Sequence, residues 1–142
     1  MKKNNKKDVA IIGFGSIGKK HFSLLRKKKE INKIYIVSKS LKKINYRNTI
    51  VVKNNNDLKH LKIDIVFICS PANNHLSDAV FFIKKEAKIF IEKPITNSLD
   101  NLKKNYKLLS EYRQNIHIGY PFRFSNAAQK LNSIIKKKFL GK

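Results

Sequence analysis

Residues 9–18 read VAIIGFGSIG, an apolar run that passes directly into a glycine-rich loop. The apolar run, residues 9–12, predicts a buried strand. Beyond the loop, apolar side chains recur at helical spacing between lysines, so we expect an amphipathic helix over residues 16–28. A strand that leads through glycines into a helix is the first half of a β–α–β unit, which predicts a parallel sheet covered by helices.

The loop GFGSIG matches the pattern G-x-G-x-x-G. Between a strand and a helix, the first glycine permits a tight turn, the second lets a pyrophosphate approach the backbone, and the third allows close helix–strand packing. Gly13, Gly15 and Gly18 hold these positions. The backbone N–H groups of Ser16 and Ile17 would face the anion at the positive end of the helix. We therefore expect a dinucleotide site here; the alternative is an ordinary glycine turn.

The remainder of the chain repeats the alternation of short β-branched runs with amphipathic segments. Strands are expected at residues 34–37, 49–52, 63–69, 89–91 and 116–119, and helices at residues 76–85, 98–113 and 127–138. Residues 54–62 are expected to form a turn and a short helix with an asparagine or aspartate as its cap. The predicted fold class is α/β, a doubly wound, mainly parallel six-stranded sheet with helices on both faces.

The chain of 142 residues has a formal net charge of +23. A charge of this size attracts polyanions, so a basic polyanion-binding protein is one interpretation. However, 28 of the 32 basic residues are lysines spread from end to end, whereas phosphate and base readers favour the bidentate fork of arginine. We interpret the charge as compositional bias on solvated faces, with weak affinity for polyanions and no specific nucleic-acid partner.

Apolar runs and cysteine content exclude other classes. The longest apolar runs have about six residues, far fewer than the roughly 20 of a membrane span, so no membrane partner is expected. The single cysteine, Cys69, excludes a disulfide framework, which suits a reducing cytoplasm. The four histidines show no convincing metal-ligand spacing, so no metal is predicted.

The segment VSKS follows the second predicted strand, where dinucleotide-binding folds choose their cofactor. A carboxylate there bonds the ribose 2′-hydroxyl of NAD and repels the 2′-phosphate of NADP. This chain has no acid at that point: Ser38 stands in its place, and Lys39 would meet a phosphate. The sequence therefore favours NADP over NAD.

Two further segments follow strands at the same predicted edge, where ligands of open α/β sheets bind. SPANNH follows residues 63–69 and contributes Ser70, Pro71 and His75 as candidate cofactor contacts. A lone histidine at a helix start is as often a capping or packing residue, so both interpretations of His75 stay open.

The segment IFIEKPIT, residues 89–96, closes the fifth strand with Glu92 and Lys93. Proline cannot continue a central ladder, so Pro94 ends the strand and holds Lys93 in an extended or turn conformation. An ammonium held beside a reacting hydroxyl or carbonyl stabilises developing negative charge or relays a proton. Lys93 is therefore the candidate catalytic residue; taken alone, the segment is also compatible with an ordinary charged strand end.

Four segments, VAIIGFGSIGKKH, DIVFICSPANNH, IFIEKPI and IGYPFRF, resemble in order and separation the amino-terminal half of the Gfo/Idh/MocA oxidoreductase family. The resemblance covers about residues 8–142. It implies a Rossmann domain and hydride transfer between a nicotinamide cofactor and a hydroxyl or carbonyl of a sugar, cyclitol or nucleotide sugar.

The resemblance also implies roles for individual residues. The glycine loop and the loop after the fourth strand contact the cofactor, Glu92 lies near the nicotinamide ribose, and Lys93 contacts nicotinamide and substrate. Arg123 matches the arginine that follows the sixth strand in the family. The peptide bond before the proline is often cis in such enzymes, so we expect a cis Lys93–Pro94 bond.

The chain departs from the family pattern in two local features and in length. Ala72 replaces a frequent asparagine, and the glycine that usually precedes the fifth strand is missing from KKEAKIF, so that turn is expected to differ. Residues 1–124 are interpreted as the dinucleotide-binding Rossmann domain. Residues 125–142 are interpreted as a connecting helix and the start of a carboxyl-terminal substrate domain, with FLGK at its first strand.

By the resemblance, that second domain supplies a catalytic histidine, often with an aspartate, most of the sugar pocket and the interface of homo-oligomers. Its absence from the chain is expected to reflect truncation, a frameshift or deliberate division of the gene. Two functions remain open: an NAD(P)-dependent oxidoreductase represented by its cofactor half, and a non-catalytic dinucleotide-binding domain.

Overall fold

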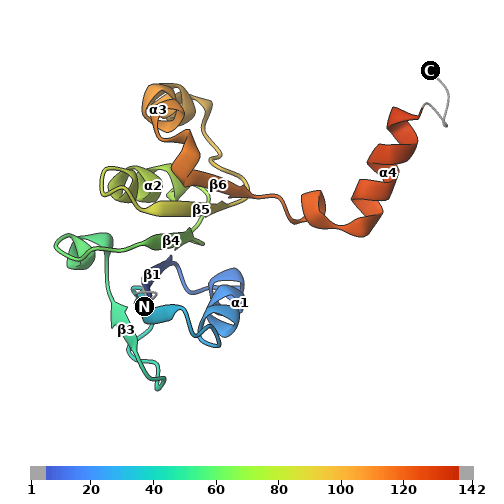
Figure 1. Cartoon of the computed structure of the whole chain (residues 1–142). Coiled ribbons are helices and arrows are strands. Elements are labelled where there is room, and N and C mark those ends of the chain that lie inside the picture. Colours follow the sequence, from blue (N-terminus) through green and yellow to red (C-terminus); the bar gives the residue numbers. More distant parts are fainter. Residues whose placement is uncertain (1–5, 138–142) are drawn as a thin grey trace, which may run out of the picture.

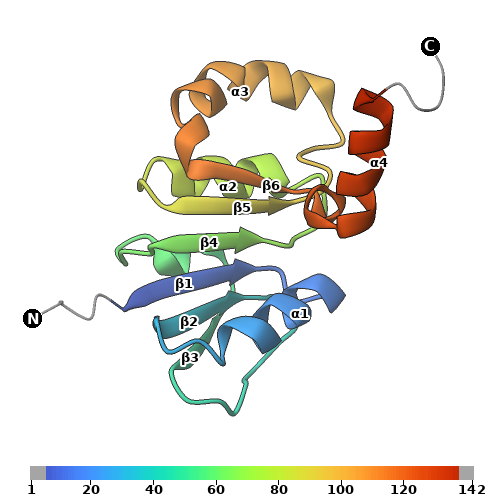
Figure 2. The ribbon, with the colours of Figure 1, turned by 45° about the vertical axis from the view of Figure 1, so that its right-hand side comes forward.

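A six-stranded sheet forms the centre of the protein, and the computed structural model describes residues 6–137. Its strands are β1 (Lys7–Ile12), β2 (Ile31–Val37), β3 (Thr49–Val52), β4 (Ile65–Ile68), β5 (Lys88–Glu92) and β6 (Ile116–Gly119). Every neighbouring pair is parallel, in the order β3-β2-β1-β4-β5-β6 (Figure 2). The predicted fold class is confirmed, and the chain changes direction across the sheet between β1 and β4.

Helices cover both faces of this sheet. The α-helices are α1 (Ser16–Leu25), α2 (His75–Ile83), α3 (Leu99–Glu111) and α4 (Asn126–Lys136), and three short 3-10 helices are η1 (Asn55–Leu58), η2 (Arg113–Asn115) and η3 (Pro121–Phe124). Figures 1 and 2 show α1 on one side of the sheet and α2 with α3 on the other. The strands therefore bury both faces, as parallel strands of α/β proteins do.

Successive side chains of each strand enter two separate cores. On the α1 side, Ile11, Ile34 and Ile36 pack with Phe22 of α1. On the other side, the buried strand residues pack with α2 and η1; they are Ala10, Ile12, Tyr35, Val37, Val66, Ile68, Ile89 and Ile91. This two-sided burial explains why the central strands read as nearly continuous apolar runs in the sequence.

The predicted helix over residues 16–28 is wrong in its last turn, because α1 ends at Leu25. The amides of Lys27 and Lys28 donate to carbonyl oxygens three residues back, which tightens the turn and stops the helix. Three exposed lysines here offer no apolar face whose packing would extend the helix.

Other boundaries differ by one to four residues from the sequence-based ranges. The strands β1 and β2 begin earlier than predicted because Lys7 pairs with Ile31 ahead of the apolar runs. Between residues 54 and 62, the expected turn and short helix are the 3-10 helix η1. Its cap is an asparagine: the side chain of Asn54 accepts from the amide of Asp57 at 3.3 Å. The other shortened elements are β4, α2 and α3, and β5 is longer by one residue at each end.

The turn between α2 and β5 has the conformation that the missing glycine would favour. Glu86 adopts φ = +60°, in the left-handed region that L-residues avoid. Its amide donates to the carbonyl of Ile83 at 3.0 Å, which closes the helix end. The turn at KKEAKIF therefore differs from the family pattern in its residue, since Glu86 replaces the usual glycine, while the tight turn itself is retained.

The helix α4 lies beyond the carboxyl ends of the strands (Figures 1 and 2). It begins at the capping residue Ser125, whose side chain accepts from the amide of Ala128 at 3.1 Å. Leu131 and Ile135 are exposed on this helix. The predicted helix over 127–138 is confirmed as far as 136; residue 138 and the predicted start of a further strand, FLGK, lie outside the described residues.

Candidate functional site

The parallel register brings the ends of four strands to one level at the carboxyl edge of the sheet. Ile12 pairs with Val37 on one side and Ile68 on the other, and Ile68 pairs with Ile91. The residues that follow these four are Ser38, Gly13, Cys69 and Glu92. Every segment that the sequence singled out as a candidate site therefore starts at this edge.

Gly13 is required by both its conformation and its neighbours. Its φ is +90°, and a Cβ there would lie 2.7 Å from the carbonyl oxygen of Cys69 and from the amide nitrogen of Ser70. The amide of Gly13 donates to the carbonyl of Val37 at 2.9 Å. Gly13 thus lets the loop after β1 pack directly on the backbone of the loop after β4.

The other two glycines of the loop have different surroundings. A Cβ at Gly18 would meet the carbonyl oxygen of Gly13 and, at 3.5 Å, the side chain of Ile11, so this glycine is required for close packing of α1 on the sheet. A Cβ at Gly15 would meet no atom within 4 Å. Space for a ligand to approach the backbone therefore lies at Gly15, as the loop pattern predicts.

The amino end of α1 is suited to an anion. Gly15 is its N-cap residue and provides no side chain to the free amides, and the first turn carries no acidic residue. Ser16 and Ile17 are both exposed there. Unpaired N–H groups at the positive end of a helix bind phosphate, so the open loop fits the pyrophosphate of a dinucleotide.

At the end of β2, Ser38 is partly buried and Lys39 is exposed. The hydroxyl of Ser38 accepts from the amide of Leu41 at 3.2 Å and lies 3.5 Å from the hydroxyl of Ser40. The residues place a hydroxyl and an ammonium here and no carboxylate. The preference for NADP over NAD stays a prediction.

A polar network that the sequence did not reveal holds the loop after β4. The hydroxyl of Ser70 donates to Asp78 of α2 at 2.6 Å, and the amide group of Asn55 in η1 donates to the other carboxylate oxygen at 2.7 Å. The side-chain oxygen of Asn55 is buried without a hydrogen-bond partner among the described residues. In the sequence, the one indication of this network was Asp78 in the first turn of the predicted helix, because acidic residues are stabilising at that position.

His75 is buried, with 2% of its surface exposed. Its Nδ1 lies 2.7 Å from the carbonyl oxygen of Pro94 and its Nε2 lies 2.6 Å from the carbonyl oxygen of Ser70. Pro71, next to Ser70, is exposed. His75 thus connects the loop after β4 with the loop after β5, and a direct contact between His75 and a cofactor stays a prediction.

The peptide bond between Lys93 and Pro94 is cis, as expected. Lys93 is exposed, whereas Glu92 is partly buried. One carboxylate oxygen of Glu92 lies 2.8 Å from Nε2 of His21 in α1. Lys93 therefore follows directly after Glu92, whose carboxylate is held in place by a hydrogen bond to His21.

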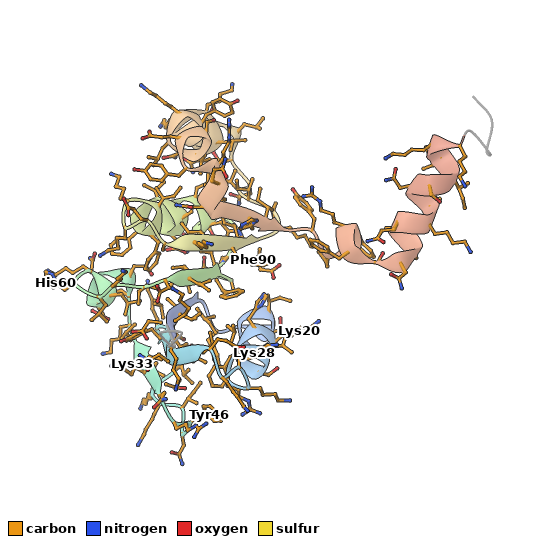
Figure 3. The ribbon with its side chains drawn as sticks, viewed as in Figure 1. Lys20, Lys28, Lys33, Tyr46, His60 and Phe90 are labelled. Atoms are coloured by element: carbon orange, nitrogen blue, oxygen red, sulfur yellow. The ribbon has the colours of Figure 1, made fainter. Side chains whose placement is uncertain are left out.

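His21 is the residue at this edge whose site role the sequence did not indicate. Its ring packs against Phe67 and Phe90, with centroid distances of 4.9 and 5.5 Å. Phe90, labelled in Figure 3, lies on β5. Gly119 leaves room for this cluster, because a Cβ there would lie 2.9 Å from Phe90 and 3.4 Å from Glu92. A histidine at helical spacing suggests packing alone, and its partner, 71 residues away, becomes visible only in the fold.

Cys69 lies beside this cluster as a free thiol. Burial, together with the negative charge of Glu92, raises the pKa of Cys69 from 9.0 to about 12. The thiol therefore carries a proton throughout the physiological range and is no nucleophile.

Arg123 lies on η3, directly beyond β6, and is exposed. Its neighbours Phe122 and Phe124 are exposed too, at 79% and 78%. The structure therefore places Arg123 on the chain that leaves the carboxyl edge toward α4, and its contact with a cofactor stays a prediction.

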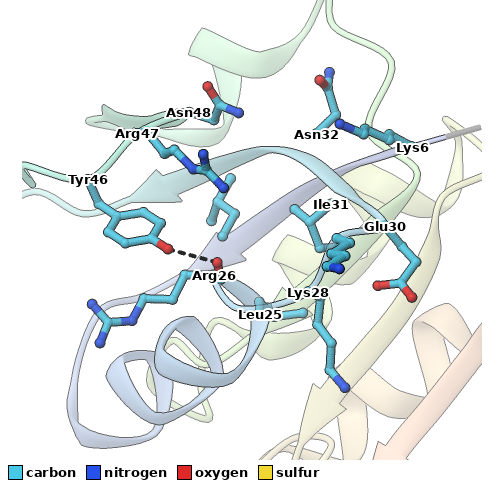
Figure 4. A pocket seen from close by; sticks show the side chains of 12 residues that line it. Lys6, Leu25, Arg26, Lys28, Glu30, Ile31, Asn32, Tyr46, Arg47 and Asn48 are labelled. Atoms are coloured by element: carbon cyan, nitrogen blue, oxygen red, sulfur yellow. Dashed lines mark hydrogen bonds between the residues drawn. The ribbon is translucent and has the colours of Figure 1, made fainter.

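A hollow of about 620 Å³ lies at the opposite, amino edge of the sheet (Figure 4). Tyr46 donates there to the carbonyl of Arg26 at 2.9 Å, and the guanidinium of Arg26 lies 5.2 Å from the centroid of the Tyr46 ring. The basic side chains that line the hollow are Lys6, Arg26, Lys28, Lys29 and Arg47, with Glu30 as the acidic one.

Within residues 6–137, no group of three or more His, Cys, Asp or Glu side chains is arranged to hold a metal ion. No helix in the described part of the chain is long and apolar enough to cross a membrane.

The sheet order, the glycine loop and the open amino end of α1 define a Rossmann domain of the NAD-binding class. The family model described as "Oxidoreductase family, NAD-binding Rossmann fold" matches residues 7–120. The chain belongs to this family, the Gfo/Idh/MocA oxidoreductases, as the four sequence segments indicated.

Individual relatives agree with this assignment. The uncharacterized oxidoreductase YrbE of Bacillus subtilis (strain 168) is 27% identical over 139 residues, which cover 94% of this chain and 41% of that protein. The crystal structure of scyllo-inositol dehydrogenase from Lactobacillus casei with bound NAD(H) and scyllo-inositol superimposes with a TM-score of 0.81 at 20% identity, over 96% of this chain and 43% of that one.

A myo-inositol dehydrogenase from Corynebacterium glutamicum ATCC 13032 has the same fold, with a TM-score of 0.80 and 17% identity over 96% of this chain and 43% of that chain. The chain thus spans about 41–43% of the length of these relatives.

Proposed function

We propose that this chain binds a nicotinamide dinucleotide at the carboxyl edge of its sheet and serves hydride transfer to or from a polyhydroxylated substrate. The observation that carries the proposal is the common level of the open glycine loop and the Glu92–Lys93–Pro94 segment at that edge. The substrate class, a sugar, cyclitol or nucleotide sugar, is supported by the inositol dehydrogenases that share the fold.

Each candidate residue receives a role in this proposal. The amides of Ser16 and Ile17, with the open backbone at Gly15, bind the pyrophosphate. Ser38 and Lys39 lie at the end of β2 and bind the adenosine ribose with its 2′ substituent. When bound, the nicotinamide supplies or accepts the hydride.

Lys93 acts on the substrate oxygen. Its ammonium donates a hydrogen bond to the hydroxyl or carbonyl that reacts, stabilises negative charge that develops on that oxygen, and exchanges a proton with it. Glu92 and the loop residues Ser70, Pro71 and His75 form the wall around the nicotinamide end, and Arg123 approaches from η3. Lys93 is the sole residue of the described chain to which the proposal gives a catalytic role.

Thermal unfolding with NADH, NADPH or ATP tests the cofactor claim. At about 100 times the dissociation constant, a ligand of the folded state stabilises it by roughly 2.7 kcal/mol, which corresponds to several degrees for a domain of this size. We expect a shift with a nicotinamide dinucleotide that exceeds the shift with ATP. If neither dinucleotide shifts the transition of the folded chain, the proposed function is wrong.

The choice of cofactor is tested at the end of β2. We propose NADP as the favoured cofactor, because Ser38 and Lys39 present no carboxylate to a 2′-phosphate. Titration of the chain with NADPH and NADH gives the affinity ratio, and Ser38→Asp is expected to move this ratio toward NADH by about tenfold or more. An unchanged ratio in Ser38→Asp would remove the proposed role of Ser38.

The second candidate function is a dinucleotide-binding domain without turnover. It is supported by the proposed boundary that makes residues 1–124 the cofactor domain, and by Lys93 being the sole described residue to which a catalytic role is proposed. Incubation with NAD, NADP and a panel of inositols and sugars distinguishes the two. Reduction of either cofactor that depends on Lys93 supports the enzyme, whereas binding without reduction supports the binding domain.

Remaining partners are proposed on narrower grounds. A reducing, cytoplasmic environment is inferred from the single free thiol of Cys69. Homo-oligomers are inferred for full-length relatives from the family resemblance. A specific nucleic-acid partner is not part of the proposal; binding of duplex DNA that remains tight at about 150 mM salt would contradict this point.

A further inference from the structure

Two histidines hold the residues on either side of Lys93. On the preceding side, Nε2 of His21 lies 2.8 Å from Oε1 of Glu92. On the following side, Nδ1 of His75 lies 2.7 Å from the carbonyl oxygen of Pro94. Lys93 itself is exposed. The segment is therefore anchored at both of its ends while its central ammonium stays accessible.

The two histidines lie on the helices that follow two other loops of the carboxyl edge, the loop after β1 and the loop after β4. His21 lies on α1, which begins after the glycine loop, and His75 is the first residue of α2, which begins after the loop that follows β4. Nε2 of His75 also lies 2.6 Å from the carbonyl oxygen of Ser70. The position of Lys93 relative to both loops thus depends on two imidazole rings.

Both rings are fixed by their surroundings. His21 packs on two aromatic rings, at centroid distances of 4.9 Å from Phe67 and 5.5 Å from Phe90. His75 is 2% exposed and has a carbonyl oxygen at each ring nitrogen. Each ring nitrogen of His75 thus faces a carbonyl oxygen, which accepts a hydrogen bond from a ring nitrogen that carries a proton. The ring of His75 therefore fixes the loop after β5, at Pro94, relative to the loop after β4, at Ser70.

The other two histidines lack these features and provide a comparison. His60 and His117 are exposed. His60, labelled in Figure 3, lies between η1 and β4, at the amino edge of the sheet. A change at His60 therefore alters histidine content and surface charge without reaching the segment that carries Lys93.

We propose that His21 and His75 are positioning residues that set the place of Lys93 relative to a bound nicotinamide. The inference rests on the proposed function of Lys93 and deepens it. The two histidines act on the nicotinamide end of the dinucleotide alone, since the pyrophosphate is bound by the glycine loop.

Paired titrations with NADH and with ADP-ribose, which lacks nicotinamide, test this inference. His21→Phe keeps an aromatic ring but removes the donor to Glu92, whereas His21→Gln keeps an amide donor in the place of Nε2. At position 75, His75→Gln keeps an amide group in the place of Nε2, which faces Ser70, and has none in the place of Nδ1, which faces Pro94; His75→Asn does the reverse. His60→Gln is the matched control.

We expect His21→Phe and His75→Gln to weaken NADH binding by about tenfold, the usual scale for a hydrogen bond to a charged or buried group. Binding of ADP-ribose should change by less than about twofold. His21→Gln and His60→Gln should approach the unchanged protein, and His75→Asn should weaken NADH binding less than His75→Gln does. Equal weakening of both ligands, or no weakening, would overturn the positioning role. If the unchanged protein bound neither NADH nor NADPH, the proposed function itself would fail.

Proton NMR of the unchanged protein keeps the inference testable if a variant does not fold. On addition of NADH, the ring resonances of His21 and His75 should shift, and that of His60 should not. ADP-ribose should leave all three in place. Shifts with ADP-ribose as large as those with NADH, or a response of His60 alone, would contradict the proposal.

Discussion

The two edges of the sheet use polar residues in opposite ways. At the carboxyl edge, His21, His75 and Asp78 bond other segments of the chain, whereas Lys93 and the amino end of α1 stay exposed. At the amino edge, the hollow is lined by basic side chains with Glu30 as the acidic one. A high net charge therefore does not single out one edge of the sheet. We propose the carboxyl edge as the site because the open backbone at Gly15 lies there beside side chains that have hydrogen-bond partners.

The edges are also far apart on the scale of screened charge. β1 has six residues and separates the edges by about 20 Å. The screening length at physiological salt is about 8 Å. The charges of the hollow are thus expected to contribute little to a ligand bound at the glycine loop.

The largest expected effect concerns the reactivity of Cys69. Its pKa, raised from 9.0 to about 12, leaves about a thousandfold less thiolate at pH 8 than an ordinary cysteine has. Labelling with a thiol reagent should be slower by that order than labelling of an Asn48→Cys probe at the amino edge in a Cys69→Ser background. Equal labelling rates in the folded proteins would contradict the described environment of Cys69.

The same thiol gives a pH dependence of stability. In the unfolded chain the thiol loses its proton near its ordinary pKa of 9.0, whereas in the fold it keeps the proton until about pH 12. The contribution of the protonated Cys69 thiol to the free energy of unfolding is therefore complete below pH 9 and is lost as the pH rises from 9 toward 12. Urea unfolding of the unchanged protein and of Cys69→Ser should therefore diverge above pH 9, with the unchanged protein losing more stability.

Gly13→Ala is expected to have the next largest effect. Its φ of +90° and the backbone atoms 2.7 Å from a Cβ add conformational strain to overpacking, and each costs about 1–3 kcal/mol. The free energy of unfolding in urea should fall by at least about 2 kcal/mol. Gly15→Ser, where the space is open and serine is a favoured N-cap, should change it by less than about 0.5 kcal/mol. Similar losses in the two variants would contradict the described loop.

The contrast between these glycines shows how far a sequence reaches. The pattern G-x-G-x-x-G after a strand predicted the separate tasks of Gly13, Gly15 and Gly18, because the tasks follow from local backbone geometry. The apolar runs predicted every strand, because burial on both faces leaves a continuous signal. The sequence did not predict the end of α1 at Leu25, which depends on weak tertiary packing.

In the candidate site, too, the features set by neighbouring residues in the chain were predicted, and the features set by tertiary contacts were not. Lys93 and its cis bond to Pro94 were predicted from the residues next to one another in the chain and from the family resemblance. The hydrogen bonds of His21 with Glu92 and of Asn55 with Asp78 join residues 71 and 23 positions apart, and no local pattern reports them. Partners of this kind come only from the arrangement of the elements in space.

Gly15→Asp separates ligand binding from stability. Aspartate is a favoured N-cap residue, so the fold should keep its stability. Two unit charges about 4 Å apart at a protein surface repel by about 4 kcal/mol, so the affinity for NADH should fall by at least about tenfold. Calorimetric titration measures this loss. Undiminished binding would show that the pyrophosphate does not lie at Gly15.

A smaller effect is expected at Glu86. Its φ of +60° strains any residue with a Cβ, and glycine removes this strain at some cost in the entropy of the unfolded chain. Glu86→Gly should raise the free energy of unfolding by about 0.5–1 kcal/mol. Glu86→Ala, which removes the charge but keeps a Cβ, is the control and should not gain stability.

The smallest effect is expected at the amino edge. Arg26→Gln and Arg47→Gln remove two charges from the hollow, and NADH affinity at physiological salt should change by less than about twofold. Lysines 104 and 107 of α3, changed to glutamine, provide a control of equal charge. If NADH affinity fell tenfold or more in the arginine variants and not in the lysine control, the binding site would lie at the amino edge instead.

The most direct test of the carboxyl-edge site is a titration of the isotope-labelled chain with NADH, followed by backbone amide NMR. The site predicts saturable shifts at Gly13, Gly15, Ser16 and Lys93, with Asn32 and Asn48 at the amino edge unchanged. Shifts confined to Asn32 and Asn48, or no shift in the folded chain at millimolar NADH or NADPH, would contradict it.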